Sequence, residues 1–172
     1  FAELSAELRT QWPALTPGLH RLHLDHEGVS LTLHFGDARE GLAQIVAQVD
    51  AFYLDGFSPA KNPALWSPKV CHLLARLGAP GATLATWSVA STVRDHLRYA
   101  GFETHMAPGF GDKRQMLRGR LLARRDGRVT TPPAPNPATP TPGSAPVRQR
   151  HLLIVGAGLA GCALSERLAA RG

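Results

Sequence analysis

The spacing of hydrophobic residues along the first 125 positions changes repeatedly between the period of a helix and the alternation of a strand. Helical spacing predicts helices over 2–12, 38–49, 68–78 and 89–100. Alternating or continuous apolar runs predict strands over 20–24, 29–35, 51–54, 82–87, 102–106 and 115–122. Because strands and helices alternate, we expect an α/β fold with a parallel sheet, whose last two strands form an antiparallel pair.

Several side chains have an expected place in this fold. The helix predicted over 38–49 directs four apolar residues inward, namely Leu42, Ile45, Val46 and Val49. Ser67 is the expected N-cap of the next helix, with Pro68 in its first turn, and Cys71 on that helix is expected in the core. Trp66 and Trp87 flank the expected ligand-binding edge of the sheet, where core packing and base stacking are both open interpretations.

Proline divides the chain into three parts. Seven of the 14 prolines lie between residues 126 and 150. Proline has no backbone N–H and a fixed φ, so we expect this segment to form an extended spacer rather than a helix or a strand. The favoured interpretation is a linker between residues 1–125 and residues 151–172, and the alternative is a proline-rich peptide that docks on a partner.

A nucleotide-binding pattern follows the linker. The strand predicted over 151–155 leads directly into a GxGxxG motif, and a helix is predicted over 162–170. Gly156 permits the tight turn, Gly158 lets a pyrophosphate approach the backbone, and Gly161 lets the helix pack on the strand. The alternative is a glycine-rich turn without a ligand. Because one strand–helix unit cannot bury its own faces, this segment alone is expected neither to fold nor to bind tightly.

The most distinctive acidic residue follows the strand predicted over 51–54. Asp55 lies at the carboxyl end of that strand, where open α/β sheets bind ligands, and Gly56 allows a close approach. The proline-bracketed loop that follows presents four more side chains, Phe57, Ser58, Lys61 and Asn62. A carboxylate in this position can orient an amine and accept its proton. The alternative is that Asp55 caps the following turn.

A second acid, Asp37, follows the strand predicted over 29–35. The surrounding residues form a less specific motif than those around Asp55. Two interpretations are open for this carboxylate, contact with a ligand and N-capping of the helix that starts at Ala38.

The charge balance favours polyanionic partners. The chain has 19 Lys and Arg against 13 Asp and Glu, a formal net charge of +6 and a sequence pI of about 10.1. Much of the excess lies between Lys113 and Arg128, where Arg114, Arg118 and Arg120 share one face of a predicted strand. Contacts with phosphate and a merely solvated face both explain this pattern.

Composition also excludes several classes of protein. No apolar run approaches the roughly 18 residues of a membrane span, and the first residues lack the basic start of a signal peptide. Cys71 and Cys162 have no C-x-x-C partner and the histidines are scattered, so we expect neither disulfides nor a metal site and favour a cytoplasmic setting. Because the chain starts at Phe1 and stops at Gly172 inside a predicted helix, we expect a piece of a longer protein.

Four segments resemble bacterial MnmC, the family of bifunctional tRNA 5-methylaminomethyl-2-thiouridine biosynthesis proteins. They read VDAFYLDGFSPAKNPALW, RLGAPGATLATWSVASTVRDHLRYAGF, PGFGDKRQMLRG and HLLIVGAGLAGCALSERLAARG. The resemblance implies that residues 1–125 are the C-terminal part of an incomplete, Rossmann-like class I methyltransferase domain that uses S-adenosylmethionine. Residues 126–150 would be the linker, and residues 151–172 the first βα unit of a second Rossmann-like domain, an FAD-dependent oxidoreductase.

The family's reactions imply roles for individual residues. The FAD domain removes the carboxymethyl group from 5-carboxymethylaminomethyl-2-thiouridine at the tRNA wobble position, and the methyltransferase domain then methylates the resulting amine. By resemblance, Asp55 would be catalytic beside the methyl donor and the amine, Asp37 would contact the donor's adenine, and Gly56 would adjoin the donor. Gly156, Gly158 and Gly161 would bind FAD. The residues expected to meet tRNA are Phe57, Lys61, Asn62, Lys113 and Arg114.

Two other functions stay open from the sequence. One is a small-molecule N-methyltransferase fused to an FAD-dependent amine oxidase, and the other is an RNA-binding fragment without catalysis. The donor's glycine-rich loop and its ribose-binding acid are expected before Phe1. We therefore expect the 172 residues alone to be inactive and to bind neither S-adenosylmethionine nor FAD.

Overall fold

The computed structural model describes residues 2–24, 29–109, 111, 113–122 and 152–155. Its helices are α1 (Ala2–Gln11), α2 (Ala38–Gln44), α3 (Pro68–Leu77) and α4 (Ser91–Tyr99). Its strands are β1 (Gly18–Leu24), β2 (Val29–Phe35), β3 (Val49–Leu54), β4 (Gly78–Thr86), β5 (Phe102–Pro108), β6 (Gln115–Leu121) and β7 (Leu152–Val155). The expected linker, the GxGxxG glycines and the helix predicted over 162–170 lie outside the described residues.

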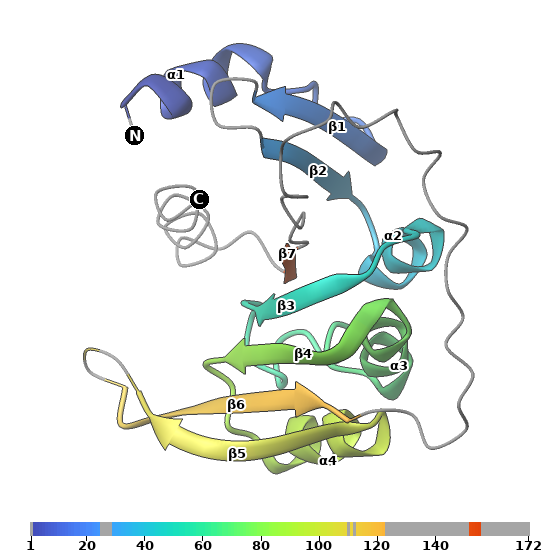
Figure 1. Cartoon of the computed structure of the whole chain (residues 1–172), viewed down its shortest axis with the longest axis vertical. Helices are drawn as coiled ribbons and strands as arrows, with labels where there is room; N and C mark the ends of the chain where they lie inside the picture. Colours follow the sequence, from blue (N-terminus) through green and yellow to red (C-terminus); the bar gives the residue numbers. More distant parts are fainter. Residues whose placement is uncertain (1, 25–28, 110, 112, 123–151, 156–172) are drawn as a thin grey trace, which may run out of the picture.

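Five strands form the main sheet, in the order β5-β6-β4-β3-β7 (Figure 1). β3 pairs in parallel with β4 on one side and with β7 on the other. β6 pairs antiparallel with both β4 and β5. The predicted parallel pairing and the predicted antiparallel pair at the end are therefore both confirmed.

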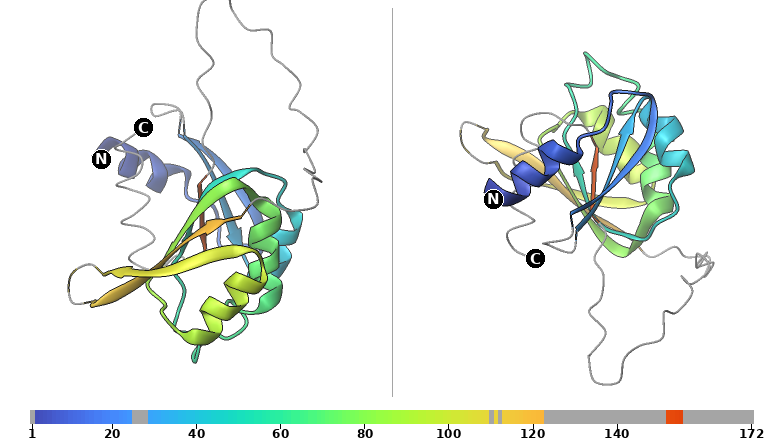
Figure 2. Two further views of the ribbon diagram at one scale, coloured as in Figure 1. Left: turned by 60° about the horizontal axis from the view of Figure 1, so that its bottom comes forward. Right: turned by 90° about the horizontal axis from the view of Figure 1, so that it is seen from above.

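One face of this sheet carries the hydrophobic core. Alternate residues of β3, β4, β5 and β6 point toward α3 and α4, which cover this face (Figure 2). Phe52 of β3 and Phe102 of β5 meet edge to face with ring centroids 5.8 Å apart, and both are fully buried. α3 contributes six buried residues to the core, so its amphipathic sequence explains both its position and the burial of Cys71.

The residues between these core positions form the opposite face. Strand register places Tyr53, Ala85, Arg118 and His105 in one row across β3, β4, β6 and β5. Their exposure rises along this row, from half-buried on β3 and β4 to exposed on β6 and β5. The helices α3 and α4 do not cover this face (Figure 2), and Arg118 and Arg120 of β6 are exposed.

A separate hairpin precedes the main sheet. β1 and β2 pair antiparallel over their whole length and form a two-stranded sheet of their own. Among the described residues of this hairpin only Leu22 and Leu24 are buried, and α1 has no buried residue. Trp12 and Phe35 contact each other with ring centroids 6.4 Å apart, although Trp12 stays 49% exposed. This region therefore contributes much less buried surface than the main sheet.

The helix predicted over 38–49 is wrong in its second half. The helix α2 ends at Gln44, Val46 is 75% exposed, and Val49 is the first residue of β3. Arg76 of α3 donates to the carbonyls of Leu42 and Ile45, at 2.7 and 3.1 Å, and so satisfies the carbonyls at the end of this helix. A contact between residues distant in the sequence thus ends the helix before the apolar spacing does.

The strand expected to open a second domain is part of the main sheet. β7 pairs residue for residue with Ala51 to Leu54 of β3, and Leu153 packs against the core. The backbone N–H and C=O groups of the four consecutive apolar residues of β7 pair with those on the outer edge of β3, which would otherwise have no partner strand among the described residues. The described residues thus show one main sheet and no separate second domain.

Candidate functional site

The candidate site lies where β3 and β4 end. Their arrowheads lie on the same side of the sheet in Figure 1, because the two strands are parallel. Asp55 directly follows β3, and Trp87 follows β4 one residue beyond the paired Leu54 and Thr86. Asp55 thus lies, as predicted, at the carboxyl end of a parallel strand. Open α/β sheets bind ligands at this edge.

The Asp55 carboxylate has one buried oxygen without a hydrogen-bond partner among the described residues. Asp55 is half-buried, and the oxygen shielded from solvent is its Oδ2 atom. A buried carboxylate oxygen without a donor costs free energy, and such atoms in native structures generally need an explanation. A ligand N–H or ammonium group that donates to Oδ2 would remove this cost. The local structure therefore suits Asp55 for binding a donor-rich ligand better than for capping a turn.

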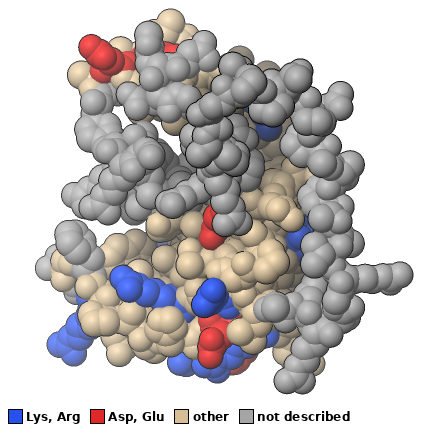
Figure 3. Space-filling view, in the orientation of Figure 1, with Lys and Arg blue, Asp and Glu red and all other residues tan. Residues whose placement is uncertain are grey.

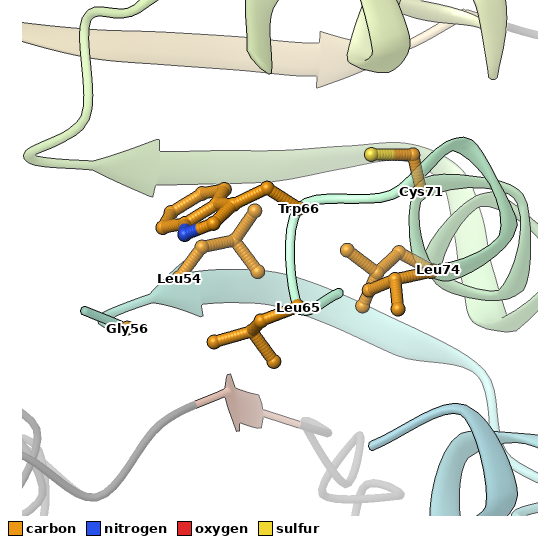
Figure 4. Close-up of a pocket in the computed structure, with 7 residues that line it drawn as sticks. Leu54, Gly56, Leu65, Trp66, Cys71 and Leu74 are labelled. Atoms are coloured by element: carbon orange, nitrogen blue, oxygen red, sulfur yellow. The ribbon is translucent and has the colours of Figure 1, made fainter. Parts of the chain in front are cut away.

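A buried tryptophan anchors the loop that follows Asp55. Trp66 is 5% exposed, and its indole Nε1 donates to the carbonyl of Phe57 at 2.8 Å. Figure 4 shows the indole beside Leu54 of β3, with Cys71 and Leu74 coming from α3. Of the two interpretations left open for Trp66, the structure thus shows core packing, which holds the loop against the sheet.

The space under this loop is a packing gap. It measures about 10 Å³, and its lining consists of Leu54, Gly56, Leu65, Trp66, Val70, Cys71 and Leu74. Cys71 is 2% exposed and so is a core residue, as expected, and this burial raises the pKa of its thiol to about 11. A Cβ atom on Gly56 would lie 2.2 Å from Leu65 Cδ2, which means that the close approach at Gly56 is made to this leucine.

The loop residues predicted to bind substrate have different environments. Phe57 is 74% exposed and Lys61 is exposed, so both side chains are accessible. Asn62 is half-buried, and its Oδ1 accepts from the backbone N–H of Leu65 at 3.3 Å. Asn62 therefore shapes the loop locally, whereas Phe57 and Lys61 are available to a partner.

The environment of Asp37 matches its capping interpretation. Asp37 is the N-cap of α2, where Oδ1 accepts from the Arg39 backbone N–H at 2.8 Å. The Arg39 guanidinium donates three further hydrogen bonds to the two carboxylate oxygens. These bonds hold the pKa of Asp37 at about 2, below its usual 3.8. The four bonds occupy the acceptor capacity of the carboxylate, so a contact with adenine stays a prediction that requires Arg39 to move.

The structure does not bring Asp37 and Asp55 together. β2 ends at α2, beside the point where β3 begins, and Asp55 follows the other end of β3 (Figure 1). The two acids therefore lie at opposite ends of β3.

Basic residues gather at β5 and β6. On the face that Figure 3 shows, Lys and Arg are concentrated over these two strands. Arg114, Arg118 and Arg120 are exposed, as is Lys113 in the loop before β6. The backbone N–H of Gly109 donates to the carbonyl of Arg114 at 3.2 Å and closes this loop. The strand register confirms a shared face for Arg118 and Arg120, whereas Arg114 precedes β6 and lies outside this register.

Other predicted sites have a simpler outcome. Gly156, Gly158 and Gly161, expected to bind FAD, lie outside the described residues. Within the part of the chain that the structure describes, no group of three or more His, Cys, Asp or Glu is arranged to hold a metal ion. No helix among the described residues is long and apolar enough to cross a membrane.

Sequence reasoning did not find the contact that fixes the loop to α4. His96 Nδ1 lies 2.8 Å from the carbonyl of Trp66, 30 residues away in the chain. Together with the indole of Trp66, this contact positions the loop that carries Asp55. No sequence motif marks it, because the two residues meet only through the packing of α3 and α4.

Comparison with protein families gives a match over most of the chain. The family model described as S-adenosyl-L-methionine-dependent methyltransferase matches residues 1–121. This range contains every helix and strand described except β7.

Similar proteins carry consistent names. A protein of Azoarcus sp. (strain BH72) is 60% identical over 172 residues, and one of Aromatoleum aromaticum is 56% identical over the same length. Both are named tRNA 5-methylaminomethyl-2-thiouridine biosynthesis bifunctional protein MnmC. The chain spans 25% of the length of each of these relatives.

A solved structure has a similar fold. The crystal structure of MNMC2 from Aquifex aeolicus matches with a TM-score of 0.54 and 28% sequence identity. The match covers 68% of this chain and 36% of that chain. The alignment thus includes most of the residues that the structure describes.

Proposed function

Because the chain belongs to the S-adenosyl-L-methionine-dependent methyltransferase family, we propose that it forms part of a tRNA-modifying methyltransferase. The reaction is N-methylation of 5-aminomethyl-2-thiouridine at the tRNA wobble position. In the longer protein it follows an FAD-dependent step that removes the carboxymethyl group and frees the amine. The names of the 60% and 56% identical relatives support the pathway, and the matched family supports the methyl donor.

Asp55 is the residue on which this proposal depends. S-adenosylmethionine supplies an electrophilic methyl group when it is bound. An alkylammonium has a pKa near ~10, so the substrate amine must lose a proton before its nitrogen can bond to carbon. Asp55 Oδ2, buried without a partner among the described residues, is suited to accept an N–H hydrogen bond and orient the nitrogen lone pair. Transfer would form the C–N bond as the S–C bond breaks, leaving the donor as a neutral thioether and the product as a secondary ammonium, which would keep its proton or pass it to Asp55 or water.

The surroundings of Asp55 fit this role. Trp66 and His96 fix the loop after Asp55, so the carboxylate is held by rigid neighbours rather than by a mobile segment. Alignment of amine, methyl group and sulfur contributes roughly 7–11 kcal/mol in well-oriented reactions, and fixed loops are what maintain such alignment. Phe57 and Lys61 extend from the same loop, where we place them against the nucleotide that carries the amine.

The remaining parts of the proposal rest on the resemblance and the relatives' names. Lys113 and Arg114 contact tRNA phosphate, Gly56 adjoins the methyl donor, and Gly156, Gly158 and Gly161 bind FAD in the longer protein. We place the reaction in the cytoplasm, where tRNA is modified. The 172 residues alone, without the donor's glycine-rich loop, bind neither S-adenosylmethionine nor FAD, and calorimetry that detects micromolar binding of either contradicts this statement.

One assay separates this proposal from its main competitor. The full-length protein that contains this chain is incubated with radiolabelled S-adenosylmethionine and either tRNA bearing 5-aminomethyl-2-thiouridine or small primary amines. We expect label in the tRNA only, at the wobble nucleoside after digestion. Label in small amines without transfer to tRNA would establish the small-molecule N-methyltransferase instead. Absence of transfer to either acceptor would contradict a catalytic role.

A further inference from the structure

A second concave site lies at the end of the β5–β6 hairpin. It is an open cavity of about 270 Å³ between the end of β5 and the start of β6. Its lining consists of Met106, Ala107, Pro108, Arg114 and Gln115. The first three provide an apolar floor, and the last two bring a guanidinium and a carboxamide to its rim.

The polar groups of this cavity are available for a ligand. Arg114 and Gln115 are exposed, and neither side chain has a hydrogen bond or ion pair within the described residues. The cavity's shape is set by the backbone, because Gly109 N–H donates to the carbonyl of Arg114 and a Cβ on Gly109 would lie 2.1 Å from the carbonyl oxygen of Lys113. This tight turn therefore holds the rim residues in place without using their side chains.

Strand register relates the cavity to Asp55. Leu54 pairs with Thr86, and Thr86 pairs with Leu117. Asp55 comes one residue after Leu54, and in the antiparallel β6 the residue at the same level is Met116, one residue before Leu117. Met116 in turn pairs with Ala107 of the cavity floor. Three strand spacings of about 4.8 Å separate β3 from β5, so the cavity lies about 14 Å from Asp55 along the same edge.

We propose that this cavity binds a ribonucleotide that neighbours the methylated uridine in the tRNA. The inference rests on the proposed function, since it takes the RNA substrate from there. A base or ribose rests on the apolar floor, the Arg114 guanidinium binds phosphate, and the Gln115 carboxamide contacts a base edge. At about 14 Å from Asp55, the bound nucleotide is a neighbour of the reacting one rather than the reacting nucleotide itself.

Binding measurements on the full-length protein test the phosphate contact. Fluorescence anisotropy with a labelled anticodon stem–loop RNA gives the dissociation constant at several salt concentrations. Arg114→Gln is expected to weaken binding roughly tenfold and to reduce the salt slope by about one. Lys69→Gln, at an exposed lysine of α3 on the helix-covered side of the sheet, is the matched charge control and leaves the slope unchanged. Equal effects of the two variants would overturn the proposal.

A double-mutant cycle tests the base contact. Gln115→Ala is combined with stem–loop RNAs that carry one abasic nucleotide at each loop position in turn. The proposal predicts that the effect of Gln115→Ala, roughly threefold to tenfold in the dissociation constant, disappears at one position near the wobble nucleotide. Effects that add at every position would overturn it. Thermal unfolding of each variant checks the fold, and Arg114→Lys, which keeps the charge, restores the salt slope.

Three further outcomes are informative. Displacement of the RNA by free uridine monophosphate at concentrations near the RNA's own dissociation constant would identify a mononucleotide site and overturn the RNA assignment. If the wild-type protein transfers no methyl group to tRNA, the proposed function fails, whatever the binding data show. If it transfers methyl groups but Gln115 shows no coupling to any loop position, only this inference fails.

Discussion

The ends of β2 and β3 look alike in the sequence and differ in the structure. Each strand is followed by an aspartate, Asp37 and Asp55, and each aspartate has a glycine beside it. Asp37 accepts four hydrogen bonds from Arg39 and caps α2. Asp55 keeps one buried oxygen without a partner among the described residues. A strand-end acid that is locally satisfied has a structural role, whereas one left unsatisfied by a rigid scaffold is the better candidate for binding a ligand.

The two strand ends also differ in how firmly they are held. Trp66 is buried and hydrogen-bonded within the loop after β3, whereas Trp12, which contacts Phe35 at the end of β2, is half exposed. Trp66→Ala is therefore expected to reduce the free energy of unfolding of the chain by about 3–5 kcal/mol, and Trp12→Ala by less than about 1 kcal/mol. Urea unfolding followed by circular dichroism measures both. Equal losses would remove the distinction between the two regions.

Cys71 reports on the packing under the loop after β3. Its pKa of about 11 leaves roughly 100-fold less thiolate at pH 8 than an ordinary thiol near 9 would have. In a Cys162→Ser background, we expect a thiol reagent to label the native chain at least roughly 100-fold more slowly than the urea-unfolded chain. The added substitution Trp66→Ala should accelerate labelling, and Trp12→Ala should not. Fast labelling of the native chain would show that this region opens readily.

The ion pair between Asp37 and Arg39 at the end of β2 is expected to make a small contribution to stability, and this contribution depends on pH. The pKa of Asp37 is lowered in the folded chain to about 2, from 3.8, by its hydrogen bonds to Arg39. Its contribution to stability is therefore complete above about pH 4 and is lost as the pH falls toward 2. Asp37→Asn keeps a good N-cap, so its destabilisation at pH 7 should shrink over this window. In an Arg39→Gln background, the difference in stability between chains with and without Asp37→Asn should be small at every pH. A difference that persists in this background would show that Arg39 is not the cause of the lowered pKa.

Local patterns in the sequence predicted most elements of the fold. The apolar spacing of α3 and the alternation in β6 identify these elements because helix and strand periods are local properties. The length of α2 was not predictable in this way, since Arg76 binds the carbonyls at its end from 31 and 34 residues away. The pairing of β7 with β3 was not predictable either, because any apolar strand can satisfy the edge of a parallel sheet.

The candidate site was predictable in part. The position of Asp55 at a strand end follows from the sequence, and its unsatisfied oxygen does not, since that depends on how the loop packs. Trp66 was open to two interpretations because an indole serves both core packing and base stacking, and its burial decides between them. The cavity beside Arg114 and Gln115 could not be predicted from the sequence, because its position depends on the strand register. That register brings the end of β5 and the start of β6 level with the end of β3.

The most direct test of the account is methyl transfer by an Asp55→Asn variant of the full-length protein. Asparagine has nearly the same shape and removes the carboxylate, so tRNA binding and thermal stability should persist while the rate with aminomethylated tRNA falls at least roughly 100-fold. Asp95→Asn, at an exposed position of α4, is the matched control and should retain full activity. Transfer by the Asp55→Asn variant within roughly threefold of the wild-type rate would contradict the catalytic role of Asp55.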